Sequence, residues 1–322
     1  GDVYKRQVME YDIKPAASRF HALTVQPDGT VGEFVRSLDV SENSRTTYRK
    51  AVLKFLDYLQ ERGIEAPAAQ DILDYKEHLR SLYAANTVNT YLCAVKLFFA
   101  YAADMGAYPN VAAKVKKLRV PRDHKKDDFS ALQARGILDG IDRDTLQGKR
   151  DYAIINTMFR TGLRDIEVSR ARICDIRNKS GHTVLYVHGK GHEEADAFVI
   201  LTPKAYEAIL DYLRSRKAAG HNTAADSALF AAYGNRNQDG HMTPRSISRI
   251  VKSTLVRSGY DSSRWTAHSL RHSAVSMALA AGATIMDAKD MARHENVETT
   301  MIYAHNAQRF SHSAESAIDS VL

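Results

Sequence analysis

The second half of the sequence contains several side chains of the types that bind phosphate. They are two arginines, one lysine and two histidines: Arg164, Lys190, His268, Arg271 and His294. A guanidinium group matches the geometry of phosphate oxygens and can hold two of them at once. Arg164 follows Thr161-Gly162-Leu163, an expected turn into a helix, where backbone N–H groups also face an anion. These residue types predict a site for a phosphate-bearing substrate.

Other common phosphate and metal signatures are absent from the sequence. The Gly-Lys-Gly at 189–191 lacks the spacing of a phosphate-binding loop, and no dinucleotide-binding glycine pattern or zinc-spaced cysteine pair occurs. His268 and His272 have the i, i+4 spacing of helical metal ligands. No glutamate follows His268, however, and Arg271 between the two histidines disfavours a cation. We therefore expect neither a metal nor a cofactor.

Each of these residues has an ordinary structural explanation when it is considered alone. An arginine at a helix start usually forms a surface ion pair, and a lysine between glycines is usually solvated. A single histidine is more often a structural hydrogen-bonding residue, and Tyr303 is one of 16 tyrosines. A functional interpretation therefore depends on the order and spacing of the whole set.

That ordered set resembles the tyrosine recombinase (integrase) family. The resemblance rests on Thr-Gly-Leu-Arg-Asp-Ile-Glu at 161–167, Gly-Lys-Gly at 189–191, Thr-Ala-His-Ser-Leu-Arg-His at 266–272, and Thr-Thr-x-x-Tyr-x-His at 299–305. The resemblance covers about residues 30–310. Its most specific parts are the His-x-x-Arg pattern at 268–271 and the spacing of nine residues from His294 to Tyr303. Two features depart from the family pattern. Arg293 replaces a common glycine, and Glu193 and Glu194 follow Lys190, where further basic residues are frequent.

The resemblance implies roles for seven residues. The catalytic residues would be Arg164, Lys190, His268, Arg271, His294 and Tyr303, with Glu167 orienting the region of Arg164. The arginines and His294 would hold the non-bridging oxygens of a DNA phosphate, because preorganised cations stabilise the extra negative charge of the transition state. Tyr303 would attack phosphorus and form a 3′-phosphotyrosyl link, His268 would accept its proton, and Lys190 would protonate the departing 5′-oxygen. Arg293 would either alter the turn before His294 or add a phosphate contact.

Four amphipathic helices are predicted before this set of residues. Thr30 and Glu33 have the spacing of a capping box that opens the first helix. Apolar residues at helical spacing predict further helices over 44–61, 68–82 and 86–103, and Gly106 and Pro109 end the last of them. We expect a compact all-α bundle, which the resemblance identifies as a SAM-like core-binding domain.

A strongly basic segment follows the expected bundle. Residues 114–126 include seven basic residues but only one acidic residue, Asp123. The basic residues are Lys114, Lys116, Lys117, Arg119, Arg122, Lys125 and Lys126. Such a segment is not expected to form a core, and its charges repel it into an extended conformation. It is either a solvated linker or a strap along a phosphate backbone, where each neutralised phosphate releases counterions. The resemblance favours the second interpretation, so these seven residues are our DNA-binding candidates.

The remaining sequence predicts a mostly helical catalytic domain. Ser130 and Gln133 form a capping pair, and helices are expected at 149–159, 164–172, 203–218, 244–258, 269–281, 285–292 and 298–304. Residues 183–188 and 197–201 predict a β-hairpin with Lys190 near its tip. The fold class is therefore mainly α with a small antiparallel sheet, and the resemblance implies that it is the DNA breaking-rejoining fold. The expected divisions are an extension at 1–27, the core-binding domain at 28–112, the linker at 113–128 and the catalytic domain at 129–322.

Composition restricts the class of protein. The 322 residues contain 45 Lys and Arg against 38 Asp and Glu, a formal charge of +7 that weakly suggests a polyanionic partner. No apolar run reaches the ~18 residues of a membrane helix, and the start lacks a secretory pattern, although Met9 is a candidate native start. The two cysteines, Cys93 and Cys174, exclude a disulfide framework. We expect a cytoplasmic, nucleoid-associated protein.

The resemblance also implies partners. These are a double-stranded DNA recombination site, three further copies in a homotetramer on DNA, and a partner recombinase or accessory factors; without DNA the chain would be a monomer or weak oligomer. Fewer than 30 residues precede the bundle, so a simple two-domain, Xer-like architecture is expected. Residues 308–322 predict an amphipathic tail that docks on a neighbouring copy or on its own domain. A type IB topoisomerase and a non-catalytic DNA-binding factor are the alternatives.

Overall fold

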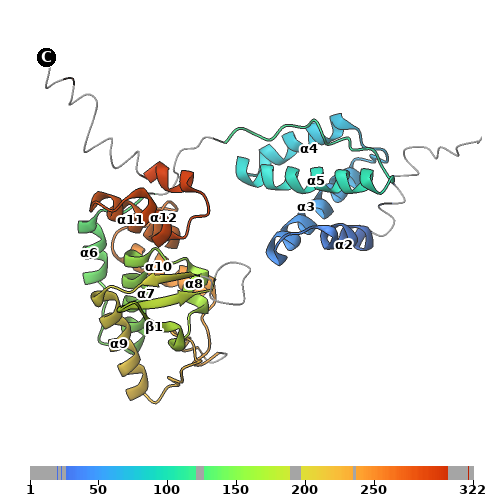
Figure 1. Cartoon of the computed structure of the whole chain (residues 1–322). Coiled ribbons are helices and arrows are strands. Elements are labelled where there is room, and N and C mark those ends of the chain that lie inside the picture. Colours follow the sequence, from blue (N-terminus) through green and yellow to red (C-terminus); the bar gives the residue numbers. More distant parts are fainter. Residues whose placement is uncertain are drawn as a thin grey trace, which may run out of the picture. The chain divides into compact units, whose positions relative to one another are not determined.

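The computed structural model describes residues 20, 23, 27–120, 127–188, 197–234, 237–303 and 318. It divides into two compact units, Gly1–Asp123 and His124–Leu322, and each has its own apolar core (Figure 1). Helices dominate both units, and the second also contains a three-stranded antiparallel sheet. The expected fold class is confirmed. No helix in these ranges is both long and apolar enough to cross a membrane.

Residues 27–120 of the first unit form the expected bundle of four helices. They are α2 (Pro27–Ser37), α3 (Glu42–Glu61), α4 (Ala69–Leu82) and α5 (Ala85–Asp104). Fully buried aromatic rings fill the bundle, with Phe55 and Phe99 packed edge to face at 5.8 Å between centroids. The proposed cap at Thr30 is wrong, because α2 begins at Pro27 and Thr30 lies inside it. Phe20, in the stretch left outside the expected fold, is buried and stacks on Phe99.

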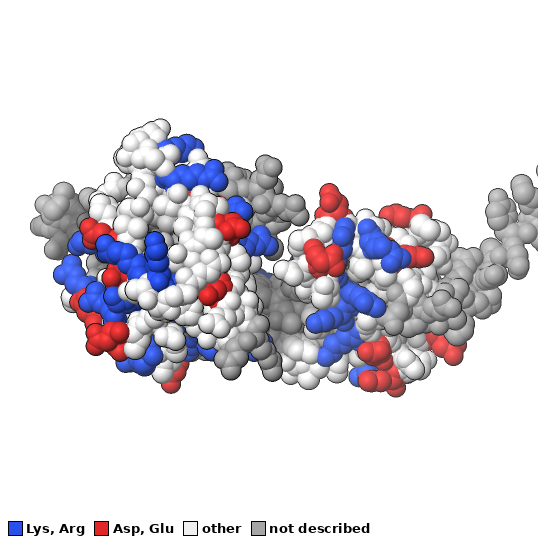
Figure 2. Space-filling view, turned by 90° about the horizontal axis from the view of Figure 1, so that it is seen from below, with Lys and Arg blue, Asp and Glu red and all other residues white. Residues whose placement is uncertain are grey.

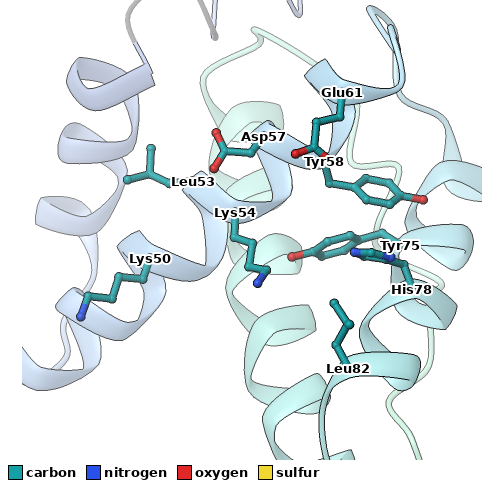
Figure 3. A pocket seen from close by; sticks show the side chains of 9 residues that line it. All are labelled: Lys50, Leu53, Lys54, Asp57, Tyr58, Glu61, Tyr75, His78 and Leu82. Atoms are coloured by element: carbon teal, nitrogen blue, oxygen red, sulfur yellow. The ribbon is translucent and has the colours of Figure 1, made fainter.

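Helices α3 and α4 are held together by aromatic packing around a shallow cleft. Figure 3 shows the rings of Tyr58 and Tyr75 side by side, with centroids 4.8 Å apart. Tyr75 is fully buried, and its hydroxyl has no hydrogen-bond partner among the described residues. Burial therefore raises the pKa of Tyr75. Apolar contact, rather than polar pairing, fixes this face of the bundle.

The first part of the basic segment packs against the bundle. Val115 is 4% exposed, and Leu118 packs against the same core. Lys76 Nζ donates to the Lys116 carbonyl at 2.9 Å, and the Asn89 side chain bonds both backbone groups of Leu118. The expectation that this segment stays clear of a core is therefore wrong for Val115 and Leu118, whose apolar side chains outweigh the repulsion between their neighbours.

The basic side chains of that packed part point outward. Lys114, Lys116, Lys117 and Arg119 are all exposed, whereas Arg122, Lys125 and Lys126 lie outside the described residues. Figure 2 shows Lys and Arg gathered in a band across this unit, with acidic side chains at its edges. The apolar residues of this segment hold its backbone against the bundle, and the basic residues between them extend into solvent.

The second unit contains the remaining elements. Its helices are α6 (Ala131–Asp139), α7 (Leu146–Thr161), α8 (Asp165–Arg170), α9 (Pro203–Ala218), α10 (Pro244–Arg257), α11 (Ala267–Ala280) and α12 (Ile285–Ala292), and residues 297–303 are also helical. The expected capping pair of Ser130 and Gln133 is confirmed, and Thr243 caps α10. Helices α9 and α12 have the predicted bounds.

The sheet has one strand more than the sequence predicted. Strands β1 (Ile176–Lys179), β2 (His182–Val187) and β3 (Ala197–Ile200) pair antiparallel in that order. Only Ile176 of β1 is partly buried, so the strand lacks an alternating apolar pattern. Its signal is the two-residue Ser180-Gly181 turn, where both φ angles are positive (51° and 81°), the geometry that joins tight hairpins.

Helix α7 forms the centre of the unit and leads directly to the candidate site. Its side chains are buried on several faces, including Ile154, Ile155 and Met158. The helix ends at Gly162, whose φ of 62° lies in the left-handed region that glycine adopts without a steric penalty. The chain turns there and places Arg164 two residues later, at the start of α8.

Candidate active site

Three segments of the second unit meet around the expected phosphate site. The turn from α7 to α8 supplies Arg164, and the first turns of α11 supply Arg271. The end of α12 and the helical residues 297–303 supply His294 and Tyr303. Hydrogen bonds and ring contacts connect these segments, so residues more than a hundred positions apart lie together.

Arg271 is fixed in the interior between two of these segments. Its side chain is 3% exposed, Nη1 donates to the Gly162 carbonyl at 2.6 Å, and Nη2 donates to the Ala292 carbonyl. Burial lowers the pKa of Arg271 to about 9, and the charges of Arg164 and Arg293 act in the same direction. The guanidinium stays charged at neutral pH and has more N–H donors than these two bonds use.

Arg164 remains accessible while its backbone is fixed. Its backbone N–H donates to Glu167 Oε2 at 2.7 Å, and its Nη1 donates to Glu167 Oε1 at 2.8 Å. The side chain is 37% exposed, so it can reach an external phosphate. Nη2 donates to the Arg293 carbonyl at 3.3 Å. Arg164 therefore lies on the same network as the end of α12.

Glu167 is the buried acceptor of this network. Its side chain is 2% exposed. Burial alone would raise the pKa of Glu167, but the positive charges and hydrogen bonds of Arg293 and Arg164 outweigh it and lower the pKa. The carboxylate is ionised at neutral pH. The structure thus brings Glu167 together with Arg164, as the expected supporting role requires.

Arg293 has an unusual backbone conformation. Its φ of 55° lies in the left-handed region, which explains why a glycine suits this position. Its Nη2 donates to Glu167 Oε2 at 2.7 Å, and its Nε donates to Oε1 at 3.2 Å. Of the two roles expected for this residue, an altered turn or a phosphate contact, the structure shows a side chain directed at Glu167.

Tyr303 is held in a small apolar cluster. It is 7% exposed and packs with Val275, Ala288 and Ala292. Its hydroxyl forms a hydrogen bond with Nδ1 of His272, and the ring of His294 stacks on it at 6.4 Å. The phenol is therefore placed beside imidazole groups and near the end of α12.

His272 has a contact in the candidate site that the sequence pattern did not predict. The sequence suggested it only as a metal-site partner of His268, yet it contacts the phenol of Tyr303 and is 8% exposed. The available signal was its position directly after Arg271 on the buried face of α11. His268, the expected base, is exposed, and its ring lies 4.5 Å from that of His272. Both histidines are thus candidates for accepting the phenol proton.

His294 is oriented by a buried threonine. Its Nδ1 lies 2.8 Å from Oγ1 of Thr300, which is fully buried, and this bond leaves Nε2 as the ring nitrogen for a ligand. Burial lowers the pKa of His294 to about 4, and the charges of Arg271, Arg164 and Arg293 contribute in the same direction. The neutral imidazole can donate a hydrogen bond without adding charge.

The lowered pKa of His294 predicts a pH dependence of stability. Between pH 6.5 and about 4 the unfolded chain binds a proton at this residue that the folded chain does not. The contribution of His294 to folding stability is therefore fully present above pH 6.5 and is lost as the pH decreases toward 4. Urea unfolding at pH 7, 6, 5 and 4 should show a shallower loss for His294→Gln than for the native chain. Equal slopes for both chains would contradict this assignment.

Lys190 lies outside the described residues, between the end of β2 and the start of β3. His188, the residue that precedes this gap, has Nε2 3.3 Å from Oδ2 of the fully buried Asp175. Arg172 Nη2 donates to the same carboxylate at 3.1 Å. The base of the strand connection is therefore anchored. Within the described ranges, no group of three or more His, Cys, Asp or Glu could hold a metal ion.

Comparison with protein families identifies two matching regions. Residues 129–309 match the Phage integrase family, and residues 33–106 match the Phage integrase N-terminal SAM-like domain. The first match covers more than half of the chain and includes every candidate catalytic residue. The second covers most of the helical bundle.

Similar proteins extend over both matched regions. The y4rA protein of Sinorhizobium fredii is 30% identical over 279 residues, which cover 82% of this chain and 64% of that relative. The tyrosine recombinase XerC of Halalkalibacterium halodurans is 25% identical over 302 residues, 88% of this chain and 94% of its own length. The tyrosine recombinase XerD of Rickettsia conorii is 24% identical over 86% of this chain and 94% of its own length.

Solved structures show the same fold. The XerH site-specific recombinase bound to a palindromic difH substrate has a TM-score of 0.72 at 16% identity, covering 94% of this chain and 85% of its own. A lambda integrase fragment, crystallised as a dimer on a COC′ core site, has a TM-score of 0.63 at 15% identity, covering 88% of this chain and 94% of its own. Both proteins were solved with DNA.

Proposed function

Because the chain belongs to the phage integrase family of tyrosine recombinases, enzymes that break and rejoin DNA, we propose that it is a site-specific recombinase whose nucleophile is Tyr303. One observation carries the assignment of the residue. The phenol of Tyr303 bonds His272 on α11, one residue after the buried Arg271, and stacks on His294. A hydroxyl nucleophile, a proton acceptor and cationic donors thus occupy one site.

The reaction follows from these positions. Arg164, Arg271 and Nε2 of His294 bind the non-bridging oxygens of the scissile phosphate and stabilise their charge as the phosphorus becomes five-coordinate. The Tyr303 oxygen forms a bond to phosphorus, and its proton passes to a histidine, His272 or His268. The bond from phosphorus to the 5′-oxygen breaks, and that oxygen takes a proton from Lys190. The products are a 3′-phosphotyrosyl link and a 5′-hydroxyl.

Rejoining uses the same site in reverse. A 5′-hydroxyl from another strand attacks the phosphotyrosyl phosphorus and releases Tyr303, so the energy of the original phosphodiester is retained in the covalent link. No step consumes a nucleotide. Two such exchanges recombine two duplexes, which requires four active sites and hence a homotetramer assembled on DNA.

The proposed partners follow from this reaction. The substrate is a double-stranded recombination site, and the exposed Lys114, Lys116, Lys117 and Arg119 are placed to contact its phosphates. Arg122, Lys125 and Lys126 extend the same basic segment. A partner recombinase or accessory factors would set the direction of exchange. We place the protein with the nucleoid in the cytoplasm.

The alternatives are less well supported. A type IB topoisomerase would share the tyrosine and its cationic residues, but the chain also matches the SAM-like domain of phage integrases, and its named relatives are recombinases. A non-catalytic DNA-binding factor would be expected to have lost part of the site. Arg164, Arg271, His294 and Tyr303 are all present and lie together.

Covalent capture tests the proposal. The chain is incubated with nicked genomic fragments, so that the short strand released by cleavage diffuses away and the phosphotyrosyl product accumulates. We expect a denaturant-resistant protein–DNA species that forms in EDTA, and a digested peptide in which Tyr303 carries the nucleotide. Sequence-specific binding with no covalent species, or attachment through another residue, would refute the proposal.

A further inference from the structure

We propose that Arg293 is a positioning residue that occupies the carboxylate of Glu167 and thereby keeps Arg164 available for the scissile phosphate. This inference rests on the proposed function, because it assigns Arg164 to the phosphate. It concerns a residue of this particular chain, since glycine is common at this position in the family that the sequence resembles.

The left-handed backbone conformation of Arg293 disfavours any residue with a Cβ atom, so the contacts of the side chain must offset this cost. The residue ends α12 with φ 55° and ψ 50°, a conformation that glycine adopts readily and a residue with a Cβ atom rarely does. Strained positions of this kind persist where the surroundings compensate for them, and they cluster at functional sites. His294, the next residue, belongs to the candidate site.

The contacts of the side chain supply that compensation. Its Nε and Nη2 bind the two oxygens of Glu167, a fork-to-fork arrangement, and its Nη1 donates to the Met291 carbonyl at 2.5 Å. The Arg293 side chain is 11% exposed and that of Glu167 is 2% exposed, so the pair is shielded from water. Arg293 therefore ties the end of α12 to the first turn of α8.

The division of the carboxylate determines what Arg164 can do. Arg293 contacts both oxygens of Glu167, whereas the side chain of Arg164 contacts only Oε1, through Nη1. Without Arg293, the carboxylate would attract Arg164 as its nearest cation, and the fork of Arg164 would close on both oxygens. The donors that the phosphate needs would then be directed inward.

Arg293 also adds to the positive charge around the expected phosphate position. Arg164 and Arg293 form ion pairs with Glu167, and Arg271 lies near enough for the charges of all three to act on its pKa. These three guanidiniums and one carboxylate together carry two net positive charges. Removing Arg293 leaves one. The charge of Arg293 is felt at Arg271, where it contributes to the lowered pKa. Arg293 thus increases the positive potential at the phosphate without occupying the phosphate position itself.

The test is a set of variants of the full chain, read by the rate of covalent adduct formation at saturating DNA. Arg293→Gly removes the guanidinium and relieves the backbone, so it should fold; we expect a rate about 10- to 100-fold lower with DNA affinity little changed. Arg293→Lys keeps the charge without the fork and should give an intermediate rate. Lys289→Ala, which removes a positive charge from the same helix, should retain the native rate.

The double variant Arg293→Gly with Glu167→Gln distinguishes this role from a merely structural one. Removing the carboxylate charge releases Arg164, so the double variant should recover most of the rate lost by Arg293→Gly. A double variant that is as slow as Arg293→Gly, or slower, overturns the proposal. That result is also the one expected if Arg293 bound the phosphate directly.

Crystal structures of the native and Arg293→Gly chains test the same inference without activity. We expect Arg164 to contact both oxygens of Glu167 in the variant and one in the native chain. An unchanged single contact overturns the proposal. Because these structures need no DNA cleavage, failure of the native chain to form any adduct would refute the recombinase assignment separately.

Discussion

Tyr303→Phe is expected to remove the covalent protein–DNA adduct, with a loss of at least about 10³-fold in single-turnover cleavage. Phenylalanine keeps the ring that packs with Val275, Ala288 and Ala292, so the site retains its shape. Only the hydroxyl is lost, and no other group on that ring can attack phosphorus. The rate is measured from the adduct on a denaturing gel, and DNA affinity from a gel shift.

A matched variant shows that the effect belongs to this hydroxyl. Tyr260 lies in the same unit, with its ring packed on Phe129 and Trp265, and it is not among the candidate catalytic residues. Tyr260→Phe removes a hydroxyl from a packed ring in the same way and should cleave at the native rate. Adduct formation by Tyr303→Phe at more than a trace would mean that another residue is the nucleophile.

Arg271→Lys is expected to lower cleavage about 10²- to 10³-fold, the cost of removing one preorganised donor from a transition-state anion. Lysine keeps the positive charge, but it cannot reproduce a planar fork that holds the Gly162 and Ala292 carbonyls and also contacts a phosphate. Arg271→Ala should lose activity as well, but it also empties a buried position and lowers stability. The lysine variant is therefore the informative one.

The control for Arg271→Lys is a second buried arginine of the same unit. Arg150 is 8% exposed, binds Asp151 and donates to the Ala231 carbonyl at 3.1 Å. Arg150→Lys should lower the melting temperature without changing the cleavage rate of the folded chain. Equal losses of rate in the two variants would show that Arg271 acts through stability alone.

Most candidate site residues could be found from the sequence because they belong to short motifs with fixed spacing. The nine-residue spacing from His294 to Tyr303 and the His-x-x-Arg of α11 are local patterns that can be read from the sequence without knowing the packing of the chain. Helix α7 ends at Gly162, inside the turn expected at 161–163, and this turn sets the position of Arg164. Local signals of this kind survive folding because packing reinforces them.

The missed features depend on contacts between distant segments. His272 acquires its role from Tyr303, which lies 31 residues later, and Arg293 from Glu167, which lies 126 residues earlier. Neither pairing has a periodic signal. Strand β1 was missed because its side chains are mostly exposed and only pairing with β2 defines it. The burial of Val115 was not predicted because a single apolar residue among basic neighbours has no periodic pattern.

The apolar packing of Tyr303 has a consequence for the fate of the phosphotyrosyl link. Water and a DNA 5′-hydroxyl are chemically similar nucleophiles, and water is far more abundant. A link formed on a ring surrounded by Val275, Ala288 and Ala292 is sheltered on that side from bulk solvent. Hydrolysis, which would leave a permanent break, is disfavoured relative to ligation. If Tyr303 is the nucleophile, as proposed, this packing favours rejoining of the DNA strand over a permanent break.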